Sequence, residues 1–330
     1  MRRRDFTTGL LLAGTVPTAL AQEPAKQHRI AIVVPAGPVA DISETGPAFW
    51  RAFFEELRRL GDVEGQNLTV ERYSGEGRPE GFDDLAREVV KRNPDVTVAL
   101  SNAIARAARA ANGTMPMVWM GGDPIEAGFA TSLARPGGNI TGVTVEEGDE
   151  IWGKRLQILK EAVPSASKAA FLTMRTSSGR PEQLLREAGQ RLQISVIDMP
   201  LQVLIAAEFQ HVFGKIAQLR PDAVIVTSMG DLLPYRQLII ELVEKSRLPA
   251  MYPWREYVDE GGLMAYAVDL SELARHIADD VHEILNGTKP GDIPIYQPAK
   301  FQFLINLKAA KALGLTIPPS LLATADEVVE

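Results

Sequence analysis

Short runs of apolar, mostly β-branched residues alternate along the chain with longer stretches whose apolar residues recur every three or four positions. The first run, residues 30–34, is entirely apolar, as expected for a strand buried on both faces. Residues 49–60 then show helical spacing and stop at Gly61, a residue favoured just after a helix. The same alternation continues along most of the chain and predicts an α/β fold of parallel sheets covered by helices.

Two successive β-α-β-α sets of similar length predict two similar lobes. We expect the chain to cross between them at residues 142–145, at 263–267 and around 293–295. The first lobe then comprises residues 28–142 plus about 268–292, and the second comprises residues 143–267 plus about 293–330. A chain that crosses several times forms a multi-strand hinge, because only the crossing strands bend when a cleft closes.

The predicted elements can be given as ranges. The strands are 30–34, 67–73, 96–100, 117–120, 169–174, 194–199, 223–227 and 250–252, and the helices are 49–60, 82–90, 103–111, 182–191, 206–219, 234–246 and 272–285.

The N-terminus has the pattern of a cleavable signal peptide at residues 1–21. Three arginines, at positions 2–4, precede a short apolar stretch, and Ala19-Leu20-Ala21 is the small-x-small pattern that signal peptidase accepts. The sequence Arg3-Arg4-Asp5-Phe6 also fits the twin-arginine pattern of exported folded proteins. No later apolar run approaches the length of a membrane span. We therefore expect a soluble periplasmic protein.

Composition narrows the classes of function. The chain has 42 acidic and 35 basic residues and a net charge of −7, which argues against nucleic acid as a partner because phosphate binding needs a basic surface. It contains no cysteine, which excludes disulfides, thiolate metal sites and a thiol nucleophile.

No catalytic, cofactor or metal motif is convincing. Residues 148–154 read G-x-x-x-x-G-K, but Arg155 follows where a P-loop needs Ser or Thr to hold magnesium. His276 and His282 are six residues apart rather than at the i, i+4 spacing of a metal pair, and no G-x-S-x-G turn is present. We expect neither enzyme activity nor a cofactor.

Polar loops that follow the predicted strands are better candidates for a ligand site, because ligands of open α/β sheets bind at the carboxyl ends of strands. Ser101 and Asn102 begin the helix after the third strand, where free N–H groups suit a ligand carboxylate. Gly122 and Asp123 follow the fourth strand, and Asp123 could accept from an ammonium group. Plain helix capping and a tight turn are the alternative roles of these two loops.

Across the expected cleft we place loops of the second lobe. The candidates are Thr176 and Ser177, the loop from Ser228 to Asp231, and Tyr252 with Trp254, whose rings could wall an apolar ligand group. Pro35, at the end of the first strand, and Asp269, after the predicted strand 263–267, complete the candidate ligand-binding set.

The chain resembles the substrate-binding proteins of ABC transporters that are related to bacterial tryptophan- and tyrosine-binding proteins. The resemblance rests on segments in order through the whole mature sequence, including Gly122-Asp123-Pro124, residues 134–142 (ARPGGNITG), 153–156 (GKRL), 261–264 (GGLM), 297–301 (QPAKF), 305–308 (INLK), 310–315 (AKALGL) and 318–322 (PPSLL).

This resemblance implies a type I periplasmic-binding-protein fold, in which two Rossmann-like lobes close over a small ligand. It implies delivery of that ligand to a membrane permease driven by a separate ATPase. We expect the ligand to be an amino acid or similar small carboxylate and the protein to be a monomer. Asn102 and the Thr176-Ser177 pair depart from the family pattern, which leaves the ligand open. A periplasmic ligand sensor for a membrane signalling receptor is an alternative, and an exported hydrolase is a weaker one.

Overall fold

The computed structural model describes residues 27–145, 150–175, 177 and 179–330. The expected signal peptide, Thr176 and the first two residues of the P-loop-like segment, Gly148 and Asp149, lie outside the described residues.

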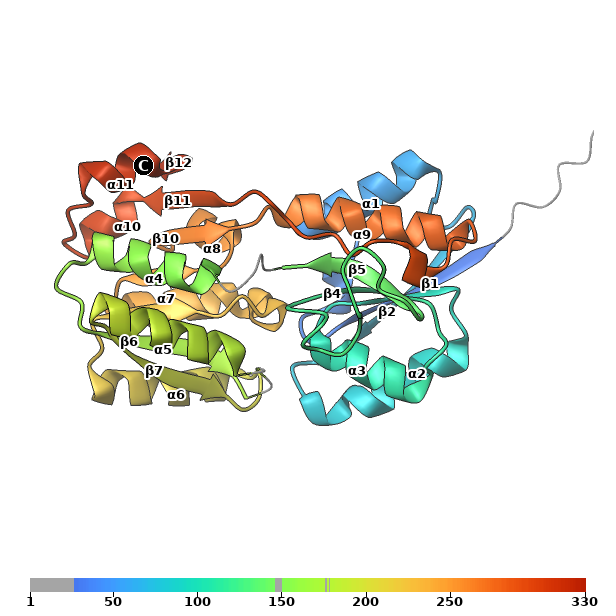
Figure 1. The fold of residues 1–330 in the computed structure, drawn as a ribbon, viewed down its shortest axis with the longest axis horizontal. Helices are drawn as coiled ribbons and strands as arrows, with labels where there is room; N and C mark the ends of the chain where they lie inside the picture. Colours follow the sequence, from blue (N-terminus) through green and yellow to red (C-terminus); the bar gives the residue numbers. More distant parts are fainter. Residues whose placement is uncertain (1–26, 146–149, 176, 178) are drawn as a thin grey trace, which may run out of the picture.

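The first sheet has five strands, all parallel, in the order β2-β1-β3-β4-β5. The strands are β1 (His28–Val34), β2 (Leu68–Ser74), β3 (Val96–Ala99), β4 (Met117–Gly121) and β5 (Ile140–Thr144). Helices α1 (Ala48–Leu60) and α9 (Leu270–Leu285) pack together on one face, and α2 (Phe82–Arg92) and α3 (Asn102–Ala111) pack together on the other (Figure 1). Two covered faces explain why β1 and β3 are apolar almost throughout.

The second sheet has seven strands in the order β12-β11-β10-β9-β8-β6-β7, and its neighbours are parallel except β10 and β11. Its strands are β6 (Lys168–Met174), β7 (Ser195–Leu201), β8 (Ala223–Val226), β9 (Ala250–Tyr252), β10 (Met264–Ala267), β11 (Gln302–Asn306) and β12 (Glu327–Val329). Its helices are α4 (Glu150–Ala162), α5 (Arg180–Leu192), α6 (Ala206–Leu219), α7 (Arg236–Lys245), α8 (Arg255–Asp259), α10 (Leu307–Ala312) and α11 (Pro319–Thr324).

The α/β fold class and all eight predicted strands are confirmed, as are the seven predicted helices apart from their bounds. The prediction that the chain crosses between the lobes within residues 142–145 and 263–267 is wrong. Residues 142–144 lie in β5, an edge strand of the first sheet, and residues 264–267 form β10, inside the second sheet. Both are held by backbone pairing and burial, so the crossings come after them rather than within them.

The chain passes between the sheets after β5, after β10 and before β11. The third passage runs beside β5, because the N–H of Thr144 donates to the Tyr296 carbonyl at 2.9 Å and the N–H of Tyr296 donates to the Gly142 carbonyl at 2.8 Å. The Tyr296 ring stacks on His276 of α9 with centroids 3.6 Å apart. The backbone pairing and the ring contact place the third passage between β5 and α9.

The lobes also meet at the edge where β2 and β7 are the outer strands. The N–H of Leu204, after β7, donates to the carbonyl of Gly77, after β2, at 3.0 Å. The Tyr235 hydroxyl donates to the Leu204 carbonyl, and Gly37 approaches Pro234 closely. We call these five residues the mouth contact; it brings the two lobes together across the opening of the cleft.

Candidate functional site

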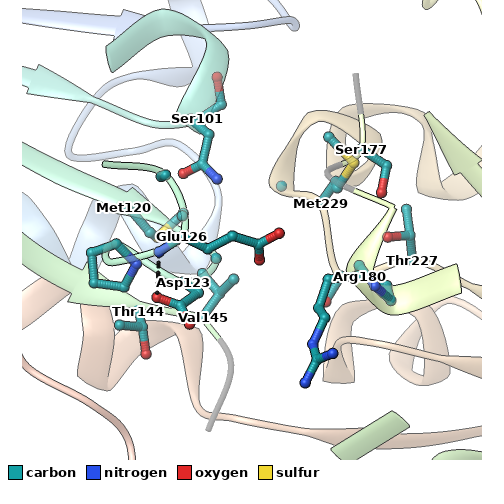
Figure 2. Close-up of a pocket in the computed structure, with 18 of the residues that line it drawn as sticks. Ser101, Met120, Asp123, Glu126, Thr144, Val145, Ser177, Arg180, Thr227 and Met229 are labelled. Carbon is teal, nitrogen blue, oxygen red and sulfur yellow. Dashed lines mark hydrogen bonds between the residues drawn. The ribbon is translucent and has the colours of Figure 1, made fainter. Parts of the chain in front are cut away.

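A cavity of about 350 Å³ lies between the two lobes, where the carboxyl ends of the strands in both sheets face each other (Figure 2). Its volume is within the range of small-molecule sites. Loops after β3, β4 and β5 form its first wall, and the start of α5 and the loop after β8 form its second wall. Of the residues predicted from sequence, Ser101, Asn102, Gly122, Asp123, Ser177 and Ser228 line it.

Ser101 lies between β3 and α3 and is the N-cap residue of α3. Its side-chain oxygen accepts a hydrogen bond from the N–H of Ile104 at 3.1 Å, which caps the helix. The residue is buried, with 8% of its surface exposed, yet it lines the cavity. Because the oxygen accepts in the cap, its O–H can still donate to a ligand, alongside the N-terminal end of the α3 dipole.

Asn102 is held by its own lobe. Its side-chain oxygen accepts from the indole N–H of Trp119 at 3.0 Å. Gly121 packs against both side chains. A Cβ at this position would lie 2.3 Å from the Asn102 side-chain oxygen and 2.6 Å from the Trp119 ring. Gly121 therefore lets the loop after β4 lie directly against Asn102, and the Asn102 amide nitrogen keeps its donors for the cavity.

Asp123 caps a turn. One carboxylate oxygen accepts from the N–H groups of Ile125 at 2.7 Å and Glu126 at 3.1 Å (Figure 2). The side chain is exposed at the rim, where water screens its charge. This is the tight-turn alternative left open by the sequence.

On the second wall, Ser177 is tied to the helix that follows it. Its hydroxyl donates to Glu182 at 2.9 Å, and the Thr173 hydroxyl donates to the other oxygen of the same carboxylate at 2.7 Å. Glu182 is buried in the first turn of α5, so this network fixes the loop after β6.

The loop after β8 contributes buried polar groups. Thr227 and Ser228 are each 1% exposed, and Asp231 is 3% exposed; all three line the cavity. Burial raises the pKa of Asp231 to about 7, and only its own backbone N–H opposes that rise. Among the described residues, no neighbouring cation offsets the burial of this carboxyl.

The cavity combines charges of both signs with an apolar part. Arg106 of α3 lines the first wall. Glu126 lies on the same wall, and Arg180, at the start of α5, lies on the second (Figure 2). Apolar lining comes from residues of both lobes, among them Met120, Leu133, Val145, Trp152, Leu184 and Met229. A small ligand that carries both charges and an apolar group fits this lining.

Four sequence candidates do not line the cavity. Tyr252 and Trp254 are each 1% exposed and pack inside the second lobe, where Tyr252 stacks on Tyr257 with centroids 4.9 Å apart. Asp269 caps α9 by accepting from the N–H of Ser271 at 2.8 Å. The Pro35 carbonyl accepts from the N–H of Gly77 at 2.9 Å, so Pro35 supports the mouth contact instead.

Arg155 shows why the P-loop-like segment is not a phosphate site. Its side chain is fully buried in the second lobe, where Nε donates to the Tyr266 carbonyl at 3.0 Å and the guanidinium lies 5.1 Å from the Trp152 ring. The arginine thus anchors α4 to the strand β10.

Sequence reasoning missed the charged residues Arg106, Glu126 and Arg180 and the ring of Trp152. Arg106 and Arg180 lie in the helices α3 and α5, Trp152 lies in α4, and Glu126 lies in the turn after β4. Local sequence patterns do not show which of their side chains reach the cavity. The loop holding Asp231 was recognised, but its burial could not be deduced from the local sequence.

Residues 48–329 match the sequence profile of the family described as ABC transporter substrate binding protein. The chain is 24% identical over 272 residues to a tyrosine-binding protein of Clostridioides difficile, covering 80% of this chain and 76% of that protein. Its fold is similar to a conserved domain protein from Vibrio cholerae, with 24% identity and a TM-score of 0.81, and to an ABC domain in complex with L-Trp from Streptococcus pneumoniae, with 20% identity and a TM-score of 0.79. Both alignments cover 92% of this chain and 100% of the other. In the described part of the chain, no helix has the length and apolar character needed to cross a bilayer.

Proposed function

Because the chain belongs to the ABC transporter substrate-binding protein family, we propose that it captures a small solute between its lobes and delivers it to a membrane permease driven by a separate ATPase. The observation that carries this proposal is the cavity, which takes its lining from both lobes. A ligand that touches both walls stabilises the closed form relative to the open one, and closure is the signal that a permease can read.

An amino acid with an apolar side chain is the ligand class we favour. Its carboxylate would lie at Ser101 and the N-terminus of α3, and its side chain against Trp152, Met120 and Met229. The mixed charges of the lining support a zwitterion. The tyrosine-binding relative and the L-Trp complex of a protein with the same fold support an aromatic member of that class.

We propose that the protein acts as a monomer in the periplasm after twin-arginine export and removal of residues 1–21. We propose the two lobes expected from the sequence, 28–142 with about 268–292 and 143–267 with about 293–330, except that Val143 and Thr144 belong with β5 in the first lobe. A binding role requires no turnover of the ligand.

The test is a thermal-shift screen of the mature protein against the twenty amino acids and small carboxylates, with D-glucose as the control. A ligand at about 100 times its dissociation constant should add about 2.7 kcal/mol of stability, which corresponds to a rise in Tm of roughly 5 °C. Small-angle scattering with the same ligand should show a smaller radius of gyration. If no amino acid or carboxylate shifts Tm, or if a bound ligand is chemically converted, the proposal is wrong.

A further inference from the structure

Asp231 differs from the other acidic residues of the cavity in its burial. It lies in the 3-10 helix Gly230–Tyr235 that follows β8, it is 3% exposed, and it lines the cavity from the second lobe. Asp123 and Glu126, on the opposite wall, are exposed to solvent.

A buried carboxyl is costly unless a cation or several donors stabilise it, and buried charges in proteins are usually paired. Here burial raises the pKa to about 7, with only the backbone N–H of Asp231 itself acting against that rise. The described chain thus supplies no cation for a carboxyl that stands beside a ligand-sized space. A ligand would supply it.

We propose that Asp231 binds the ammonium group of the ligand, so that the cargo is a small molecule bearing both an amine and a carboxylate. This rests on the proposed function, since it assigns a role within the same cavity. It moves ammonium recognition from Asp123, whose carboxylate already accepts two backbone hydrogen bonds at the rim, to a buried carboxyl of the other lobe. The amine is then held only when the second lobe closes on it.

The charges around Asp231 set the direction of a pH effect. Facing it across the cavity are Arg106, Asp123 and Glu126, and Arg180 lies on its own wall. Arg236, at the start of the neighbouring helix α7, pairs with Glu260 at 2.6 Å, and burial raises the pKa of Glu256 in α8.

An ammonium beside Asp231 favours the ionised carboxylate. Amine binding therefore releases a proton from Asp231 when the pH is at or below about 7. The affinity for an amine should fall as the solution is acidified, whereas a ligand without an amine should not show this loss.

The experiment is calorimetry with matched probes and a matched control. The probes are L-tyrosine and L-tryptophan, each beside its analogue without the amine, 3-(4-hydroxyphenyl)propionate or indole-3-propionate. The variants are Asp231→Asn and Asp280→Asn. Asp280, on α9, is also buried, and its pKa is raised by burial to about 8, but it does not line the cavity.

We expect Asp231→Asn to weaken binding of the amino acids at least tenfold at pH 8 and to leave the analogues within about threefold. Wild-type affinity for the amino acids should drop several-fold from pH 8 to pH 6, and this dependence should vanish in Asp231→Asn. Asp280→Asn should bind like wild type.

Two results would overturn the inference alone: amino-acid affinity unchanged in Asp231→Asn, or equal losses for the amino acids and their analogues. If wild type binds the analogues but no amine, the amine assignment is wrong while solute binding stands. If wild type binds neither these probes nor any solute of the thermal-shift screen, both proposals are wrong.

Discussion

The two walls of the cavity use their polar residues differently. On the first wall, Ser101 caps a helix, Asn102 accepts from an indole, and Asp123 caps a turn. On the second wall, Ser177 is likewise engaged by Glu182, but Asp231 is buried without a cation among the described residues. The first wall is therefore already stabilised within its own lobe, and the second wall retains a charge that a ligand can satisfy.

This difference suggests an order of events. A wall whose side chains are fixed by its own hydrogen bonds can receive the ligand without rearrangement, because its donors are already oriented. A buried carboxyl on the opposite lobe adds its interaction only on closure. The first wall then provides docking, and the second makes closure depend on the ligand.

The largest effect is expected from a substitution that prevents the two walls from approaching each other. Gly77 has φ = +73°, and a Cβ there would lie 2.6 Å from the Leu204 carbonyl oxygen across the mouth contact. Gly77→Ala should therefore disfavour the closed form and lower the affinity for every ligand at least tenfold, since apparent affinity scales with the closed population. Calorimetry and small-angle scattering would measure the two effects.

Gly81→Ala is the matched control, because a Cβ at Gly81 meets no atom within 4 Å and its φ is negative. It should bind like wild type. Gly77→Ala that binds and compacts like Gly81→Ala would show that the mouth contact does not contribute to closure.

A smaller effect is expected on the stability of Asp231→Asn as the pH changes. Below about pH 4, Asp231 is protonated in both the folded and the unfolded chain. As the pH rises toward 7, the unfolded chain loses this proton and the folded one retains it, so the free energy of unfolding falls. Asp231→Asn removes that loss and should raise the Tm of the ligand-free protein by roughly 4 °C or more at pH 8.5, with little change at pH 4.

Asp280→Asn should show the same trend, because the pKa of Asp280 is also raised, to about 8. Melting curves of both variants between pH 4 and 8.5 check the prediction. A destabilised Asp231→Asn at pH 8.5, with Asp280→Asn stabilised, would indicate that the Asp231 carboxylate is stabilised inside the folded protein, contrary to this description.

The smallest effect is expected at Asp123. Asp123→Ala removes two hydrogen bonds that cap its turn and should cost about 1 kcal/mol of stability, while the affinity for L-tyrosine changes less than threefold. Calorimetry alongside melting curves separates the two quantities. A tenfold loss for the amino acid, with none for its analogue, would return ammonium recognition to the first wall.

The sequence predicted elements that depend on local patterns. The buried strands and the helix ending at Gly61 follow from periodicity and a left-handed cap. β11 and β12 were missed because their pairing joins the C-terminal segment to β10, which is a contact distant in sequence.

The site residues also fall into those that a local sequence pattern predicts and those that depend on distant contacts. Ser101 and Asp123 were found because strand ends followed by capping residues are a local signal. Tyr252 and Trp254 were placed in the cleft by proximity to a strand end, but both side chains are buried in the second lobe, where Tyr252 stacks on Tyr257 of α8. The importance of Asp231 depends on its burial, which only the folded chain reveals.

The most direct test of the account is a crystal structure of the mature protein with L-tyrosine. We predict closed lobes, the ligand carboxylate within hydrogen-bond distance of Ser101 and the first N–H groups of α3, and the ammonium within hydrogen-bond distance of the Asp231 carboxylate. An ammonium held at Asp123, or a ligand bound outside the cavity between the lobes, would contradict it.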